Sequence, residues 1–348
     1  MMDWSILRKY LTQALNRYHI PGLSMAIVKE GKIILNLEFG VKNTLTHEPV
    51  TPSTVFEGAS LSKPIIAYAA LKMCQDGILD LDKPLSAYIT EPYQGNPPNL
   101  SLVTLRHVLC HTAGFPTANL KVGEPLRLAF YPGDRFVYSG NSFRYLEHVM
   151  EHLVGDIDRY IQNTVFQPLK MADSSFIWKE QYTSQAATPH DYHGKPTEKW
   201  KPKRPIASCS LHTTAMDFAK FMIEVIQKSK YNNLSQLHNM LESNIGIDKD
   251  ISWGLGWGIE TTPSRNAFWH SGDNGFFKCL AFGVQQEEFG LVMMTNGANG
   301  FKICRDVIEH SSGEAHPFIN WEDFDSDEVN VTNPEGDLLS NWWEVYGM

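Results

Sequence analysis

The stretch EGASLSKPIIAYAAL, residues 57–71, joins a polar entrance to a long apolar run. The apolar run predicts a helix, and a helix that begins at Ser60 places Ser60 and Lys63 one turn apart on the same face. Pro64 fits such a helix only within its first turn, where no backbone donor is missed. The sequence therefore predicts a helix with a serine and a lysine side by side at its start.

Ser60 and Lys63 together have the chemistry of an activated nucleophile. A serine at a helix N-terminus sits where anionic charge is favoured. A crowded, partly desolvated lysine loses its proton near neutral pH and takes the proton of the serine hydroxyl. The same spacing also fits a capping serine followed by a solvent-exposed lysine. On this stretch alone the capping interpretation is favoured, so the rest of the chain has to decide.

Composition limits the class of protein. The chain has 348 residues, 43% of them hydrophobic and 20% charged, which is typical of a globular protein with a large core. Five scattered cysteines without a Cys-x-x-Cys pair favour free thiols in a reducing compartment. The first twenty residues lack the apolar centre of a secretory signal, and no apolar run reaches about 18 residues. We therefore expect a cytoplasmic protein without a membrane span.

The net charge of −9 is unevenly placed, because the segment from residue 306 onward is rich in Asp and Glu and has no Lys or Arg. No basic patch suggests a nucleic-acid partner. The aromatic residues Trp321, Trp342 and Trp343 argue against disorder of this acidic segment. We expect it to fold back on the body as an extended strap, with its carboxylates in solvent or near the basic stretch 195–204.

Strand signals lie at both ends of the body, and helices and loops fill the middle. The expected fold class is α/β (α+β), with one antiparallel sheet built from both chain ends, flanked by helices and interrupted by a mostly helical insertion. The expected units are a sheet domain (1–75 and 206–310), a helical insertion domain (76–205) and an acidic C-terminal tail (311–348). The predicted elements are helices over 4–19, 214–227 and 301–310, and hairpins over 23–39 and 278–295.

Three further short motifs accompany Ser60-x-x-Lys63. The first is YSGN at 138–141, where Tyr138 could shuttle protons if a nearby lysine lowers its pKa. The second is HSGD at 270–273, placed just before a predicted strand, where small residues let an edge backbone approach a substrate closely. The third is LCHTAGF at 109–115, whose histidine is better explained as a structural residue bonded to a loop backbone.

In this order the motifs resemble those of the serine β-lactamase and penicillin-binding-protein superfamily, in particular its class C β-lactamase, D-peptidase and family VIII esterase branch. Weaker signals at HTAG (111–114), WGLGW (253–257) and MADSSF (171–176) resemble further motifs of the same branch. The resemblance covers residues 20–300 and implies the β-lactamase/transpeptidase-like fold.

The resemblance also implies roles for particular residues. Ser60 is implied to become acylated, while Lys63 and Tyr138 share the proton transfers. No metal and no organic cofactor is implied. The implied oxyanion hole consists of the backbone amides of Ser60 and Asp273, and the implied substrate-binding residues are Asn141, His270, Ser271 and Gly272.

Two positions depart from the family pattern. Gly140 stands where the family has asparagine, and Asn141 follows one residue later. His270 stands where a lysine is usual, and histidine is mostly neutral at pH 7. Both changes predict weaker recognition of β-lactams and of substrate carboxylates.

Plainer interpretations remain beside these roles. Tyr138 also fits a core tyrosine, and His270 a structural histidine at a strand start. The pair His148 and His152 has zinc-like spacing but no evident third ligand. The expected function is a serine hydrolase that forms an acyl-enzyme with a small-molecule substrate: an ester, a β-lactam or a D-amino-acid peptide. The alternative is a catalytically idle β-lactamase-fold protein used as a binding or scaffold module. The sequence leaves the oligomeric state open.

Overall fold

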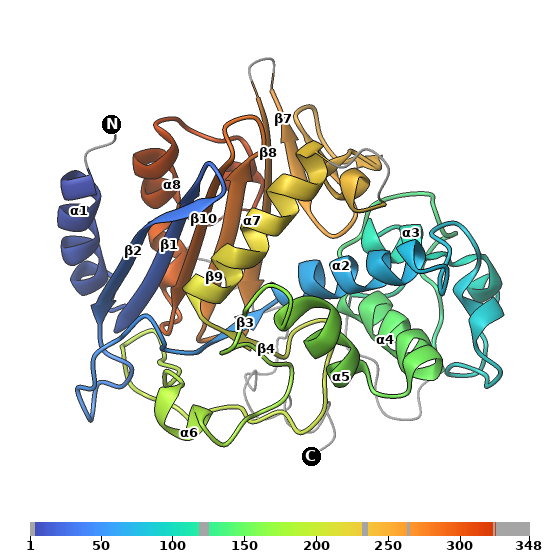
Figure 1. The fold of residues 1–348 in the computed structure, drawn as a ribbon, viewed down its shortest axis with the longest axis horizontal. Coiled ribbons are helices and arrows are strands. Elements are labelled where there is room, and N and C mark those ends of the chain that lie inside the picture. Colours follow the sequence, from blue (N-terminus) through green and yellow to red (C-terminus); the bar gives the residue numbers. More distant parts are fainter. Residues whose placement is uncertain (1–3, 118–124, 232–235, 263–264, 323, 325–348) are drawn as a thin grey trace.

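A computed structural model describes residues 4–117, 125–231, 236–262, 265–322 and 324. Its centre is an antiparallel sheet with helices on both faces, and a mostly helical region stands beside the sheet (Figure 1). This is the α/β arrangement that the sequence predicts. The strands, in their order across the sheet, are β2 (Lys32–Gly40), β1 (Gly22–Lys29), β10 (Phe289–Thr295), β9 (Lys278–Val284), β8 (Asn266–Asp273), β7 (Gly258–Thr261), β6 (Ile251–Trp253) and β5 (Ile245–Gly246).

The two predicted hairpins lie next to each other and form one half of this sheet. β1 turns into β2 through Glu30 and Gly31, whose φ angles of 51° and 70° belong to the left-handed region of tight hairpin turns. β1 then pairs with β10, so the two ends of the chain meet side by side. Both hairpins predicted from the sequence are confirmed.

Alternate residues of the central strands enter two different cores, as the strand period of two requires. Ala26 and Val28 face the core beneath helix α7 (Ala215–Tyr231), while Met25 and Ile27 face the other core. That second core is covered by α1 (Trp4–Arg17), α8 (Cys304–Ser312) and α9 (Phe318–Trp321). Each predicted helix is therefore present, within a few residues of its expected bounds.

Helix α2 (Ser62–Gln75) runs between the sheet and the helical region, and nearly all of its side chains are buried. The helix begins two residues later than the sequence predicts, because Ser60 and Leu61 form a turn in which the Lys63 amide donates to the Ser60 carbonyl. The remaining helical elements are α3 (Leu105–Leu109), α4 (Gly140–Val154), α5 (Ile157–Ile161), α6 (Tyr182–Gln185), the π-helical turn η3 (Gln162–Phe166), and the 3-10 turns η1 (Leu85–Tyr88), η2 (Leu100–Leu102), η4 (Gln236–Leu241) and η5 (Gly300–Ile303).

Several short strands were not predicted. β3 (Phe56–Ala59) and β4 (Leu211–Thr213) form a small second sheet that carries the chain into Ser60. β5, β6 and β7 extend the main sheet, and they are too short for an alternating pattern to stand out. The HSGD motif precedes the strand at Lys278, as expected, and itself forms the end of β8, a strand that was not predicted. The 15-residue α4 is also longer than the short helices expected in this region.

The beginning of the acidic tail packs on the body as a helical turn rather than as an extended strap. Phe318 is fully buried and stacks on Trp269, with ring centres 4.6 Å apart. Phe324 packs against Phe301. The segment 325–348 lies outside the described residues. The expectation that its carboxylates lie near 195–204 therefore stays a prediction. In the described part of the chain, no helix is both long enough and apolar enough to cross a membrane.

Candidate active site

Ser60 and Lys63 meet at the start of α2. Ala59, the last residue of β3, has φ of 49°, and this left-handed residue turns the chain sharply so that Ser60 is part-exposed. The Lys63 side chain is 2% exposed, and its Nζ lies 2.8 Å from Ser60 Oγ. Lys63 Nζ also donates to the carbonyl of Ser208 at 2.9 Å. The lysine is therefore a buried group held on the serine, which excludes the solvent-exposed lysine of the capping interpretation.

The environment of Lys63 makes its amine a base at neutral pH. Burial lowers the pKa of Lys63 to about 7, against a small opposing effect of the neighbouring Cys209 thiol. The amine lies 4.8 Å above the centre of the Tyr138 ring and 5.9 Å from that of Phe143. A large share of the molecules thus carries a neutral amine beside Ser60 at pH 7.

Tyr138 reaches the same point from the loop before α4. Its phenol forms a hydrogen bond with Ser60, yet burial dominates and raises the pKa of Tyr138 well above its ordinary value. The sequence had suggested that a nearby lysine lowers this pKa, and the shift has the opposite direction because burial of the phenol outweighs its hydrogen bond with Ser60. Tyr138 therefore stays protonated and acts as a hydrogen-bond donor.

His111 holds the loop that carries Tyr138. Its Nδ1 accepts a hydrogen bond from the Ser139 amide at 3.1 Å, and its ring lies 4.3 Å from the Tyr138 ring. Burial lowers the pKa of His111 well below its ordinary value. The residue is neutral and bonded to a loop backbone, as the sequence indicates.

His270 lies across from these residues on β8. Its Nδ1 bonds to the Ser271 carbonyl at 2.6 Å and is therefore the protonated nitrogen. Its Nε2 is buried and has no hydrogen-bond partner among the residues that the structure describes. Burial lowers the pKa of His270 to about 3, with a further contribution from Lys63. The ring is thus neutral at pH 7 and supplies no positive charge for a substrate carboxylate.

The remaining residues of the HSGD motif have different surroundings. A side chain at Gly272 would lie 2.5 Å from the Gly58 carbonyl, so glycine allows β8 to approach β3. Asp273 is half exposed and pairs with Lys278 at 2.5 Å. The Ser271 hydroxyl donates to Glu322 at 3.0 Å. Glu322 follows α9, and nothing in the sequence pointed to it.

Asn141 is buried at the start of α4, and its side-chain amide donates to the Pro116 carbonyl at 2.9 Å. The amide thus holds the loop at Pro116, and its proposed contact with substrate stays a prediction. Gly140 leaves room beside Ser208, because a Cβ there would lie 3.4 Å from the Ser208 Cβ. Sequence reasoning also missed the Ser208 carbonyl, which positions Lys63, because a backbone acceptor leaves no signal in the sequence.

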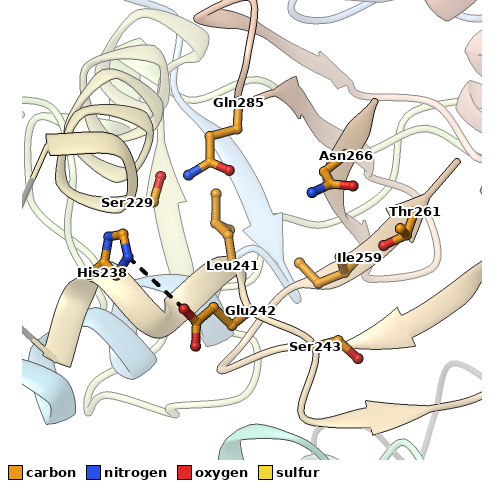
Figure 2. Close-up of a pocket in the computed structure, with 9 residues that line it drawn as sticks. All are labelled: Ser229, His238, Leu241, Glu242, Ser243, Ile259, Thr261, Asn266 and Gln285. Carbon is orange, nitrogen blue, oxygen red and sulfur yellow. Dashed lines mark ion pairs between the residues drawn. The ribbon is translucent and has the colours of Figure 1, made fainter. Parts of the chain in front are cut away.

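Two other regions are separate from this site. His148 and His152 were considered as metal ligands, and the described residues contain no group of three or more His, Cys, Asp or Glu arranged to hold an ion. A polar pocket of about 320 Å³ lies near η4, where His238 and Glu242 are 4.0 Å apart. Figure 2 shows the residues that line it. None of the predicted site residues lines that cavity.

The model of the beta-lactamase family matches residues 7–313. Protein flp of Staphylococcus aureus strain N315 is 25% identical over 310 residues, which cover 83% of this chain and 62% of flp. This chain therefore spans less than two thirds of the length of that relative. A beta-lactamase of Pseudomonas fluorescens is 25% identical over 259 residues, which cover 71% of each protein.

Solved structures share the fold. The octameric penicillin-binding protein homologue from Pyrococcus abyssi superimposes with a TM-score of 0.77 at 22% identity, over 92% of this chain and 81% of its own. The D-alanine carboxypeptidase AmpC from Burkholderia cenocepacia superimposes with a TM-score of 0.73 at 21% identity, over 85% of this chain and 95% of its own. With a family match over nearly the whole chain and this shared architecture, the protein belongs to the beta-lactamase family.

Proposed function

We propose that this protein is a serine hydrolase that cleaves ester or amide substrates through an acyl-enzyme on Ser60. The observation that carries the proposal is the contact of 2.8 Å between Lys63 Nζ and Ser60 Oγ, made by an amine whose pKa burial lowers to about 7. A neutral amine at this distance accepts the hydroxyl proton as the oxygen attacks. Membership of a family with hydrolase relatives supports the same conclusion.

The proposed reaction has two balanced halves. Ser60 Oγ attacks the substrate carbonyl while its proton passes to Lys63, and the bond to the leaving group then breaks as that group takes a proton back. Water attacks the resulting ester of Ser60, gives up a proton through the same groups, and releases the carboxylic acid. Tyr138, which remains protonated, donates to Ser60 or to the leaving group. The backbone amides of Ser60 and Asp273 are proposed to bind the oxyanion.

The substrate class is proposed from the departures at Gly140 and His270. Two similar proteins are named as a beta-lactamase and a D-alanine carboxypeptidase, so β-lactams and D-amino-acid peptides are candidates beside small esters. His270 offers no positive charge to the carboxylate that such substrates carry. We expect small neutral esters to be hydrolysed with higher kcat/KM than β-lactams.

The test is covalent labelling followed by intact mass and peptide mapping. A fluorophosphonate should add one group per chain at Ser60, and Ser60→Ala protein with an unchanged melting temperature should take none. A folded wild-type protein without an adduct would refute the proposal and favour the catalytically idle binding module. A clear preference for nitrocefin over p-nitrophenyl butyrate would refute the ester preference alone.

A further inference from the structure

The carboxylate of Glu322 is bonded to β8, the strand that carries the third motif. Its Oε1 accepts from Trp269 Nε1 at 2.8 Å, and its Oε2 accepts from Ser271 Oγ at 3.0 Å. Trp269 and Ser271 are two residues apart, so they point to the same side of the strand. The side chain of Glu322, from the C-terminal segment, thus accepts a hydrogen bond from the hydroxyl of Ser271, the residue after His270.

This contact decides what the hydroxyl of Ser271 can offer to a substrate. An ionised carboxylate only accepts hydrogen bonds, so the proton of the Ser271 hydroxyl points to Glu322. The hydroxyl then presents only its lone pairs to anything that approaches. A substrate carboxylate needs a hydrogen-bond donor, but the Ser271 hydroxyl would offer it only an acceptor.

Among the described residues, three nearby titratable groups offer no free positive charge to an anion. His270 is neutral, and Lys278 on the neighbouring strand is paired with Asp273. Lys63 is held on Ser60 and on the Ser208 carbonyl. Burial raises the pKa of Glu322 above its ordinary value, and its bonds from Trp269 and Ser271 offset only part of that rise.

Glu322 is also close enough to act on the reaction site. Its charge contributes to raising the pKa of Tyr138, whose phenol bonds to Ser60. Trp321, the residue before it, packs against Phe136 and Trp253. Trp253 in turn contacts both Tyr138 and His270.

We propose that Glu322 is a specificity-determining residue that makes the site reject substrates with a carboxylate near the scissile carbonyl and favour neutral or cationic ones. The inference rests on the proposed function and narrows its substrate class. Peptides with a free C-terminal carboxylate and β-lactams are then poor substrates. Esters or amides that carry an ammonium group are good ones.

The test uses three p-nitrophenyl esters of equal length, with pentanoyl, 4-carboxybutanoyl and 4-(trimethylammonio)butanoyl groups. For the wild-type protein, kcat/KM should be highest for the cationic ester and lowest for the anionic one. In Glu322→Gln the ratio of anionic to cationic kcat/KM should rise at least about tenfold, because a unit charge in a partly buried site has been removed. Glu322→Asp keeps the charge and should keep the wild-type order.

A purely structural role of Glu322 would affect all three esters alike. Glutamine retains the size of the side chain and can bond to both Trp269 and Ser271, so the melting temperature should remain near that of the wild type. The matched control is Glu314→Gln, which makes the same change of net charge at a carboxylate that pairs with Arg265. An unchanged ratio in Glu322→Gln, or an equal change in Glu314→Gln, would overturn the inference.

A binding measurement separates failure of this inference from failure of the proposed function. The p-nitroanilides of the same three acids are titrated into Ser60→Ala protein, with and without Glu322→Gln, by ligand-observed NMR. Binding of the anionic anilide should strengthen when the charge of Glu322 is removed. If Ser60 takes no label but this shift occurs, the hydrolase is refuted and the charge selection stands. If labelling succeeds and the shift is absent, Glu322 does not select.

Discussion

The two walls of the site have diverged differently from the family pattern. The nucleophile wall, formed by Ser60, Lys63 and Tyr138, keeps the serine, lysine and tyrosine of the motifs that the sequence resembles, with a short contact between Lys63 and Ser60. The strand wall, formed by His270, Ser271 and Glu322, has a neutral ring and an added carboxylate. We infer that, in this chain, the groups proposed for bond making match the motif pattern more closely than the groups proposed for recognition.

The difference has a structural origin. In the nucleophile wall, local spacing at one helix start brings Ser60 and Lys63 together, and the loop before α4 adds Tyr138. The strand wall depends on Glu322, which follows α9 and bonds to Ser271. A single substitution of Glu322 should change the charge of this wall without disturbing Ser60. The predictions below test this separation between reaction and recognition.

The largest expected effect is that of Ser60→Ala, which should abolish turnover of every substrate while leaving the melting temperature near that of the wild type. The hydroxyl is the only group removed, and its oxygen is the proposed nucleophile. Rates on p-nitrophenyl butyrate and thermal unfolding are measured on the same preparation. Residual hydrolysis within a few-fold of the wild type would show that the nucleophile wall is not where the reaction occurs.

Lys63→Ala and Tyr138→Phe should each lower kcat by at least about 100-fold, the usual scale of general acid–base catalysis. The loss should be similar for charged and neutral esters, because neither side chain belongs to the strand wall. A loss confined to one charge class would contradict the separation of the two walls. Circular dichroism of both variants checks that the fold is retained.

The pH dependence should follow Lys63. Its neutral form is the base, so kcat/KM should fall about tenfold per pH unit below the pKa of about 7 and reach a plateau above it. Burial also raises the pKa of Glu57 and of Glu147 to about 7, so these carboxyls titrate in the same window. The acid limb should persist in Glu57→Gln and Glu147→Gln. Its disappearance in either variant would assign the limb to that carboxyl instead.

The smallest expected effect is that of Gly140→Asn, which restores the family residue beside Ser208. The space there accepts a Cβ in ordinary contact, so the protein should fold normally. The added amide should raise the ratio of β-lactam to ester hydrolysis severalfold. Gly246→Asn, in β5 where a Cβ meets nothing within 4 Å and φ is not positive, is the matched control. An equal ratio in both variants would mean that Gly140 does not limit β-lactam recognition.

The sequence predicts much of this fold because its main elements have long, clear patterns. The helix at 4–17 and both predicted hairpins follow from periodicity and turn residues. The strands β3 and β5–β7 are too short to show a period, and β8 carries a Ser-Gly-Asp ending that resembles a loop. Their strand conformation depends on neighbours supplied by the rest of the sheet.

The site residues also divide into those that sequence spacing predicts and those that depend on tertiary packing. Ser60 and Lys63 are three residues apart, so one turn of chain brings them together. Glu322 reaches Ser271 only because Phe318 is buried against Trp269 and Phe282, and such packing cannot be inferred from an acidic tail. The pKa of Tyr138 was also beyond sequence reasoning, since its direction depends on how deeply the phenol is enclosed.

The position of β1 in the sheet has a consequence for how the protein is made. β1 lies between β2 and β10, and Lys29 pairs with Phe289. At roughly 5–20 residues per second, a ribosome makes β10 about ten to fifty seconds after β1. During that time the emerging chain presents a hydrophobic strand with one open edge, which is prone to pair with other chains. Newly made chains should therefore depend on chaperones until the second hairpin leaves the ribosome.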